Sequence, residues 1–394
     1  MNELEKIKTI DIHPFDTAQK GSTKGLVQYN GVFFEVSPLI VELLLILQKA
    51  SSVEEGIEQF VACKNHQYTT ESIKTVVEKN IYPMFEAKNK NSFLIKKEFL
   101  KGEHFSSLSN YLKVLFKKPL FIALFSSSIL LNVMFYYGFF SKVSIGHFDI
   151  FTLLLLLTFF LFSSFFHELG HASATQYYKV GHGGVGVALY WNFPVFYTDI
   201  SKIWKLPIKE RCVVNLGGVY FQSILLIPIL VLFFTTHNEL LKYIILLTNI
   251  NTLITLNPFF KFDGYWLITD ICGVPNLRKR LNEFLRYLIA KIRKKEVPTP
   301  YLLQLKNPQR TFLFIYFILS NAFMCFYFLY LLPRLLYHFV QEYPQRLEMV
   351  FMELSSGILP DFRDVQYLFT QTMFIAFVGY MCYLLCSKLI RIKI

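Results

Sequence analysis

Long apolar runs alternate with charged segments along this chain. Six runs contain no Asp, Glu, Lys, Arg or His, and each is long enough to cross a bilayer as a helix, which takes about 20 apolar residues. They are residues 119–140, 150–166, 213–234, 243–260, 311–332 and 365–387. The pattern predicts an α-helical polytopic membrane protein with about six transmembrane helices.

The composition supports a membrane location. Hydrophobic residues make up 53% of the chain and charged residues only 17%, which is more apolar surface than a soluble chain of this length can bury. This balance excludes the secreted, fibrous and disordered classes. The net charge of +12 comes from Lys and Arg between the apolar runs, as in loops beside an anionic lipid surface. The expected partner is therefore the lipid bilayer, and nucleic acid is not expected.

The basic residues also predict orientation, because Lys and Arg near the ends of spans stay in the cytoplasm. Basic segments precede the first span and connect the second to the third and the fourth to the fifth. The other connections are short or, at residues 333–364, carry more acids than bases. We therefore expect a multi-pass protein of the cell membrane (inner or plasma membrane) with both termini in the cytoplasm.

The first hundred residues predict a small α+β domain. Residues 25–36 favour a β-hairpin, because Asn30-Gly31 supplies two residues that tolerate positive φ in a tight turn. Three helix-start signals follow, at Ser37, Ser52 and Thr70. This ribbon with short helices resembles the PqqD-like, winged-helix modules that grip the leader peptides of ribosomally made, modified peptides. A small cytoplasmic cap without a ligand is the alternative.

Residues 277–295 predict an amphipathic helix. Apolar residues recur at helical spacing opposite Arg and Lys, at Leu277, Leu281, Phe284, Leu285, Leu288 and Ile292. We expect this helix to lie on the membrane surface, anchored by its apolar face and its positive charge. A positively charged dock for an acidic substrate or partner is the alternative.

The strongest chemical signal follows the second apolar run. His167-Glu168-Leu-Gly-His171 fits the His-Glu-x-x-His pattern, which on a helix places two imidazoles one turn apart on one face with a carboxylate beside them. That is a pair of zinc ligands with a general base. Ionisable groups at membrane depth are costly and normally functional. The alternative is a helix end whose polar residues simply meet cytoplasmic water.

A third ligand must come from elsewhere, because catalytic zinc sites use three protein ligands and keep one position open. The fourth run ends within residues 256–266, where Pro258 breaks the helix close to a lone Asp263. Irregular backbone at this depth is tolerated where it packs against protein or lines a wet cavity. If both helices end at the same depth, Asp263 reaches a Zn²⁺ ion held by His167 and His171.

These two motifs, His-Glu-Leu-Gly-His and, two spans later, Asn-Pro-x-x-x-x-Asp-Gly, resemble those of the site-2 protease family of intramembrane zinc metalloproteases. The resemblance covers about residues 150–270. It implies a three-helix catalytic core made of the second, third and fourth spans, with zinc on the cytoplasmic side. It also implies that His167, His171 and Asp263 bind the metal and that Glu168 is the general base.

The second motif departs from the family pattern. Many members have a second Pro and a Leu there, whereas this chain has Phe260 and Phe262. The variant is more similar to the branch of peptide zinc metalloproteases. The sequence shows no PDZ-like or nucleotide-sensing domain, which disfavours the stress-signalling branches.

These patterns divide the chain into five parts. They are a cytoplasmic PqqD-like, peptide-binding domain (1–101), a linker with the first transmembrane helix (102–148), the zinc metalloprotease membrane core (149–270), a basic amphipathic cytoplasmic segment (271–310), and two carboxy-terminal transmembrane helices with an external loop (311–394).

Each of two asparagines near the predicted site has two possible roles. Asn257, beside the helix break, is a candidate donor to a developing oxyanion or a turn residue. Asn215 lies in the third span, just before Gly217 and Gly218. These three residues either face the site or allow two helices to approach each other closely, and we favour the second interpretation.

The segment between the second and third spans favours strands. Residues 183–197 predict a re-entrant hairpin with a turn near Asn192, which covers the zinc or binds an unwound substrate as an added strand. His182 and Asp199 flank it and are interpreted as a loop histidine and an N-cap.

The leading hypothesis is an intramembrane zinc endopeptidase that cuts a peptide precursor or a membrane-tethered protein near the cytoplasmic face. Zinc supplies the electrophile, and Glu168 takes a proton from water and gives it to the leaving amine. A peptide exporter is a further expected partner. The alternative is a non-hydrolytic, zinc-dependent membrane transporter, immunity or peptide-binding component that uses the same cavity.

Overall fold

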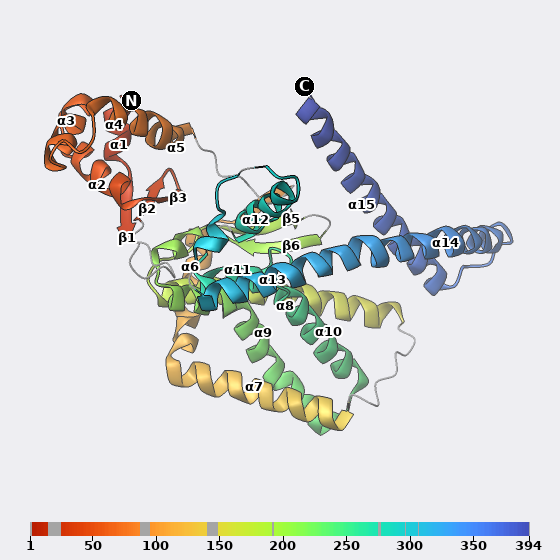
Figure 1. The fold of residues 1–394 in the computed structure, drawn as a ribbon. Coiled ribbons are helices and arrows are strands. Elements are labelled where there is room, and N and C mark those ends of the chain that lie inside the picture. The colour runs from red at the N-terminus through yellow and green to blue at the C-terminus, as the bar shows by residue number, and fades with distance from the viewer. Residues whose placement is uncertain are drawn as a thin grey trace. The chain divides into compact units, whose positions relative to one another are not determined.

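The computed structural model describes residues 2–14, 25–86, 95–139, 149–190, 193–274, 277–295, 297–305 and 307–393. The chain falls into two compact units (Figure 1). One contains Met1–Ala188 with Pro194–Tyr301, and the other contains Leu189–Phe193 with Leu302–Ile394. Helices predominate in both, which confirms the predicted helical class.

The amino-terminal module begins with a helix and three strands: α1 (Glu3–Lys8), β1 (Asp11–Pro14), β2 (Gly25–Tyr29) and β3 (Val32–Val36). The strands form an antiparallel sheet with the order β1-β2-β3. Asn30 and Gly31 make the turn between β2 and β3 with φ values of 47° and 77°, a conformation that these two residue types tolerate. The predicted hairpin is confirmed, and α1 and β1 extend it.

Three helical segments follow the sheet. They are α2 (Pro38–Leu47), α3 (Val53–Cys63), and a third made of α4 (Thr70–Val76), the π-turn η1 (Val77–Ile81) and α5 (Tyr82–Glu86). Ser37, Ser52 and Thr69 cap the three starts, since each side-chain oxygen accepts a backbone N–H three residues further on. The helices therefore begin where the sequence predicts. Strands and helices share one apolar core that includes Val27, Leu43, Phe60 and Ile81.

Four helical segments within the described residues are long and apolar enough to cross a membrane: α7 (Lys118–Phe139), α8 (Ile150–Tyr177), α9 (Ile208–Thr236) and Asn307–Ser355. Six were predicted. The run at 243–260 forms α10 (Glu239–Thr255), which has only 17 residues, because Pro258 disfavours helix at the residue before it. The run at 365–387 lies in α15 (Phe362–Lys393), many of whose side chains are outside the described residues.

The carboxy-terminal unit corrects the expected external loop at residues 333–364. The chain is helical without a break through α13 (Asn307–Phe326), the π-turn η6 (Tyr327–Leu331) and α14 (Leu332–Ser355). Pro333 follows the π-turn, whose altered hydrogen bonding accommodates a residue without an N–H. Two hydrogen bonds join α14 to α15, Tyr343 to Thr372 at 2.8 Å and Tyr367 to Glu342 at 2.9 Å.

A second sheet combines a strand that precedes α7 with two strands between α8 and α9. It contains β4 (Ile95–Leu100), β5 (Val185–Tyr190) and β6 (Phe193–Thr198) in the order β4-β5-β6. The hairpin expected at 183–197 thus forms, although its turn near Asn192 lies outside the described residues. The predicted boundary at residue 101 assigns β4 to the amino-terminal domain, yet β4 pairs here. Gly186 permits this pairing, because a Cβ there would lie 2.3 Å from the Lys97 carbonyl oxygen.

Shorter elements complete the first of the two units. They are α6 (Gly102–Leu112) and η2 (Lys113–Phe116) before α7, η4 (Ser201–Lys205) before α9, α11 (Asp263–Cys272) after α10, and α12 (Leu277–Ile292). α12 forms the predicted amphipathic helix. Its residues Leu277, Leu281 and Phe284 are buried, whereas Ile292 is 82% exposed.

α8 and α9 approach each other through glycine. A Cβ at Gly170 would lie 2.2 Å from the carbonyl oxygen of Gly217, so the two backbones are closer than any side chain would allow. Apolar residues surround this contact, among them Leu169, Ala172, Val214 and Phe221. The packing interpretation of Gly217 is confirmed.

Replacing Gly170 with Ala is expected to lower the thermal unfolding temperature in detergent micelles. The new methyl group must push α8 from α9, and overpacking of this kind costs about 1–3 kcal/mol. Gly138→Ala in α7 is the matched control, since no described atom outside its own helix lies within 4 Å of its Cβ position. The control should be neutral or stabilising by up to about 1 kcal/mol. Equal melting temperatures for the two variants would contradict this account.

Candidate metal centre

His167 and His171 lie one turn apart inside α8, which continues to Tyr177. The predicted span ends at residue 166, but no helix breaker follows, so the helix carries the motif into packed protein. The exposed fractions are only 7% for His167, 9% for Glu168 and 4% for His171. The motif is therefore buried, which contradicts the alternative of a helix end that meets water.

Asp263 is the first residue of α11, directly after the turn that Asn257 begins. The side-chain oxygen of Asn257 accepts the N–H of Phe259 at 2.8 Å. This turn requires glycine at position 264, because a Cβ there would lie 2.0 Å from the Leu256 carbonyl oxygen. Burial alone would raise the pKa of Asp263, but the positive charge that the two nearby histidines carry when protonated outweighs it and holds this pKa well below its usual value.

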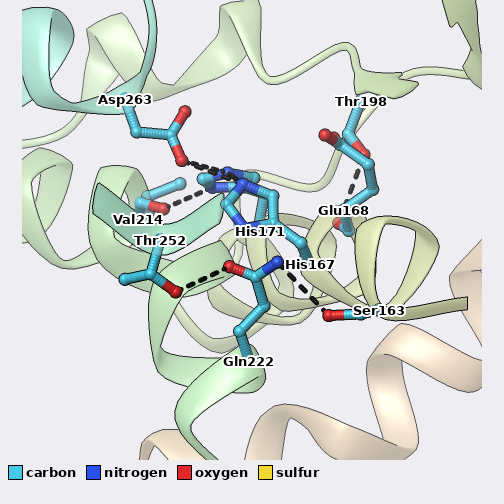
Figure 2. Close-up of polar contacts among 9 residues, drawn as sticks. All are labelled: Ser163, His167, Glu168, His171, Thr198, Val214, Gln222, Thr252 and Asp263. Atoms are coloured by element: carbon cyan, nitrogen blue, oxygen red, sulfur yellow. Dashed lines mark hydrogen bonds and ion pairs between the residues drawn. The ribbon is translucent and has the colours of Figure 1, made fainter. Parts of the chain in front are cut away.

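The three donor atoms converge (Figure 2). Asp263 Oδ2 lies 3.0 Å from His167 Nε2 and 3.1 Å from His171 Nε2, and the two Nε2 atoms are 3.1 Å apart. A tetrahedral zinc ion with bonds of 2.0–2.1 Å separates its ligands by about 3.3 Å. The triangle fits such an ion with small adjustments. Among the described residues, this is the only cluster of three such groups that could hold a metal.

The backbone of α9 fixes the orientation of His171. Its Nδ1 lies 2.8 Å from the carbonyl oxygen of Val214, and a carbonyl can only accept, so Nδ1 carries the proton. The lone pair of Nε2 then faces His167 and Asp263 (Figure 2). A hydrogen bond from the second ring nitrogen is the usual way in which proteins orient a metal-binding histidine.

Gly218 of α9 lies against the other histidine. A Cβ at this position would be 2.3 Å from His167 Nε2 and 2.4 Å from Cε1. Any other residue type would displace the imidazole ring. Gly218 thus contacts the site, whereas Gly217 serves helix packing.

Glu168 lies beside Thr198, the last residue of β6 (Figure 2). The Thr198 hydroxyl donates to the backbone carbonyl of Glu168 at 3.2 Å. This contact joins the end of β6 to the backbone of α8 at Glu168, which directly follows His167 in the sequence.

The two asparagines have different surroundings. Asn257 forms a turn, as one interpretation held, and its side-chain oxygen is occupied by the N–H of Phe259. Asn215 donates from Nδ2 to Asp270 Oδ2 at 2.7 Å, so it belongs to the packing of α9 against α11.

His182 and Asp199 lie outside the donor cluster. His182 Nε2 is 3.0 Å from Ser109 Oγ, and its Nδ1 is 2.7 Å from the Gly183 carbonyl oxygen. Burial lowers the pKa of His182 below its ordinary value. Asp199 Oδ1 accepts from the backbone N–H and the hydroxyl of Ser201. His182 is thus a loop histidine, as the sequence predicts. Asp199 forms a turn through Ser201 and is not the predicted N-cap, because Ile200 occupies the N-cap position of η4.

The sequence did not predict a chain of side-chain hydrogen bonds near the histidines, which links Ser163, Gln222 and Thr252 (Figure 2). Gln222 donates to Ser163 Oγ at 3.4 Å and accepts from Thr252 at 3.3 Å. These contacts join α8, α9 and α10 within the apolar helices. The available signal was a single Gln inside the run 213–234. The sequence could not indicate that the Val214 carbonyl orients His171, because every residue has a backbone carbonyl.

Comparison with curated proteins finds a relative. Over 117 residues the chain is 26% identical to "Putative peptide zinc metalloprotease protein YydH" of Bacillus subtilis (strain 168). The match covers 29% of this chain and 46% of the relative, so the chain spans less than half the length of the protein it matches. No protein-family profile and no solved structure matches the chain. The likeness supports a relationship to zinc metalloproteases.

Replacing Gly218 with Ala is expected to weaken zinc binding by at least about tenfold, because the methyl group displaces His167 from the triangle. The dissociation constant of the purified protein is measured by competition with a chromophoric chelator. Ser223→Ala on the same helix is the control, since that hydroxyl donates to the Val219 carbonyl. A Gly218→Ala protein with wild-type affinity would show that this contact does not set the position of His167.

Proposed function

We propose that the protein is a membrane-embedded zinc endopeptidase that hydrolyses a peptide bond near the cytoplasmic face. The observation that carries the proposal is the triangle of donors from buried His167 and His171 and half-buried Asp263, with Glu168 on the same helix as the histidines. The relative that is named as a peptide zinc metalloprotease supports the same class of reaction.

The two imidazole nitrogens and the carboxylate oxygen would hold the ion. Two His and one carboxylate are a donor set that catalytic zinc uses, and they leave one coordination position open. When bound, zinc supplies Lewis-acid chemistry, which polarises a peptide carbonyl and lowers the pKa of water toward 7. Because the Val214 carbonyl accepts the Nδ1 proton of His171, Nε2 would be the ring nitrogen that binds the ion.

Glu168 is the proposed acid–base group. Its carboxylate takes a proton from the attacking water and returns it to the nitrogen of the leaving amine. Its burial at 9% exposure limits competing bulk water. The hydrogen bond from Thr198 fixes the Glu168 backbone and so restricts where the side chain can reach.

Asn257 is the proposed donor to the oxyanion. Because its side-chain oxygen already accepts the Phe259 N–H, the amide NH₂ is held in one orientation and keeps its donor capacity. A donor positioned in advance stabilises charge that develops on the peptide oxygen. The turn and the oxyanion role are therefore compatible in one residue.

The edge of β6 is the proposed substrate platform. In the described sheet, β6 is an outer strand, and its last residue contacts Glu168. An extended substrate would add to this edge through backbone hydrogen bonds. Proteolysis needs such an extended segment, since the peptide bonds of a helix are engaged in internal hydrogen bonds.

The finer cellular setting belongs to the same proposal. The protein would have six spans and cytoplasmic termini in the cell membrane, as the basic connections favour. The substrate would be a peptide precursor, such as a ribosomally made modified peptide, or a membrane-tethered protein. The amino-terminal sheet and helices would hold a leader segment, and a peptide exporter would remove the product.

The purified protein is expected to contain about one zinc ion per chain and to cleave peptides encoded by adjacent genes until a chelator is added. Glu168→Gln should reduce kcat by at least about 100-fold while the zinc content remains unchanged, because the residue moves protons and does not bind the ion. Metal analysis and mass spectrometry of the peptides measure the two quantities.

The matched control is Glu103→Gln, which changes an exposed carboxylate of α6 and should leave both quantities unchanged. Normal cleavage by Glu168→Gln would overturn the mechanism. A non-hydrolytic zinc-dependent component would show a phenotype that survives Glu168→Gln and is lost with His167→Ala.

A further inference from the structure

A second buried polar cluster connects α9 to α11. Arg211, Asn215 and Asp270 are only 2%, 3% and 4% exposed. Arg211 Nε donates to Asp270 Oδ1 at 2.6 Å, and Asn215 Nδ2 donates to Oδ2 at 2.7 Å. Arg211 Nη1 also donates to the Leu206 carbonyl at 3.0 Å. Both oxygens of the Asp270 carboxylate are therefore engaged by α9.

The cluster fixes the helix that carries Asp263. Asp263 and Asp270 are the first and eighth residues of α11, about two turns apart and on the same face. A contact that holds Asp270 on α9 sets both the height and the rotation of α11. The direction and height of the Asp263 carboxylate follow from those two quantities.

The same face of α9 also contacts both histidines. The Val214 carbonyl accepts from His171, and Gly218 lies against His167. The contact positions 211, 214, 215 and 218 recur at spacings of three and four, which place them on one side of the helix. α9 is thus a common reference for the two elements that supply the three donor atoms.

The chemistry of the cluster suits alignment better than general stabilisation. A buried ion pair contributes little net stability compared with apolar residues of similar size, because the two charges lose their hydration. Its hydrogen bonds are directional, however, and charge-assisted bonds to both carboxylate oxygens permit one register. Apolar side chains between α9 and α11 would tolerate sliding or rotation.

We infer that Arg211, Asn215 and Asp270 are positioning residues of the metal site, which set the register of α11 on α9 and so bring Asp263 to the two histidines. This inference rests on the proposed zinc site. It assigns a function to a buried Arg and Asp that contact neither the substrate platform nor the ion.

The test replaces the ion pair with apolar residues in the full-length protein, as Arg211→Met combined with Asp270→Leu. This double variant leaves no unpaired buried charge, so the melting temperature in detergent should stay near that of the wild type. The zinc dissociation constant should rise by about 10- to 100-fold. The Co²⁺-loaded protein should show weaker visible absorption bands, because the carboxylate no longer completes the ligand set.

The control is Asn132→Leu combined with Asn249→Leu, which removes a 2.8 Å side-chain hydrogen bond between α7 and α10. It should leave the zinc dissociation constant and the Co²⁺ spectrum unchanged. Arg211→Lys is the second variant. It keeps the charge but loses the planar fork that bonds Asp270 and Leu206 together, and it should weaken zinc binding at an unchanged melting temperature.

A folded Arg211→Met/Asp270→Leu protein with wild-type zinc affinity and an unchanged Co²⁺ spectrum would overturn the inference. If the double variant fails to fold, Arg211→Lys decides the question, and wild-type affinity of that variant also overturns it. Wild-type protein that binds no zinc would overturn the proposed function together with the inference. The two failures are therefore distinguishable.

Discussion

The close approach of α8 and α9 is the constraint on which the candidate site depends. In a bilayer, lipid tails are as apolar as Leu side chains, so helices associate through close packing and hydrogen bonds. Gly170 against Gly217 brings the two backbones together, and Gly218 leaves room for the His167 ring. The same approach places the Val214 carbonyl within hydrogen-bond distance of His171. One packing contact therefore determines the shape of the site and the orientation of its ligand.

Polar groups inside these apolar helices contact one another, because unsatisfied polar groups are costly away from water. Gln222 joins Ser163 to Thr252, and Asn132 pairs with Asn249. The donor triangle differs from these pairs. Two imidazole nitrogens and a carboxylate oxygen converge at 3.0–3.1 Å, and neutral imidazoles cannot both donate to that carboxylate when Nδ1 of His171 carries its proton. A cation between the three atoms satisfies them all, which is the physical reason for reading the cluster as a metal site.

Features set by local sequence were predictable, whereas most features set by distant contacts were not. The spacing of His167 and His171 and the Asn30-Gly31 turn are local, and the structure contains both the one-turn pair and the hairpin. β4 was missed because three charged residues in a row, at 96–98, hide its alternation, and its partner β5 is far along the chain. The acids of 333–364 are typical of a loop, yet most of that segment is helical. The proximity of Asp263 to the two histidines was predicted on the assumption that both helices end at the same depth. The proximity is present, but the assumption was wrong for α8, which continues past its histidines.

Several local interactions shape the turn before Asp263. A second proline in this motif would restrict the backbone directly, and Phe260 and Phe262 cannot do so. Here Asn257 closes the first part of the turn through the Phe259 N–H, and the rings of Phe260 and Phe262 contact each other at 5.9 Å between centroids. Gly264 then lets the first turn of α11 pass beneath the Leu256 carbonyl. A side-chain hydrogen bond, an aromatic contact and a missing Cβ thus shape this turn, and they leave Asp263 at a helix N-terminus, where the helix dipole favours the ionised carboxylate that a metal requires.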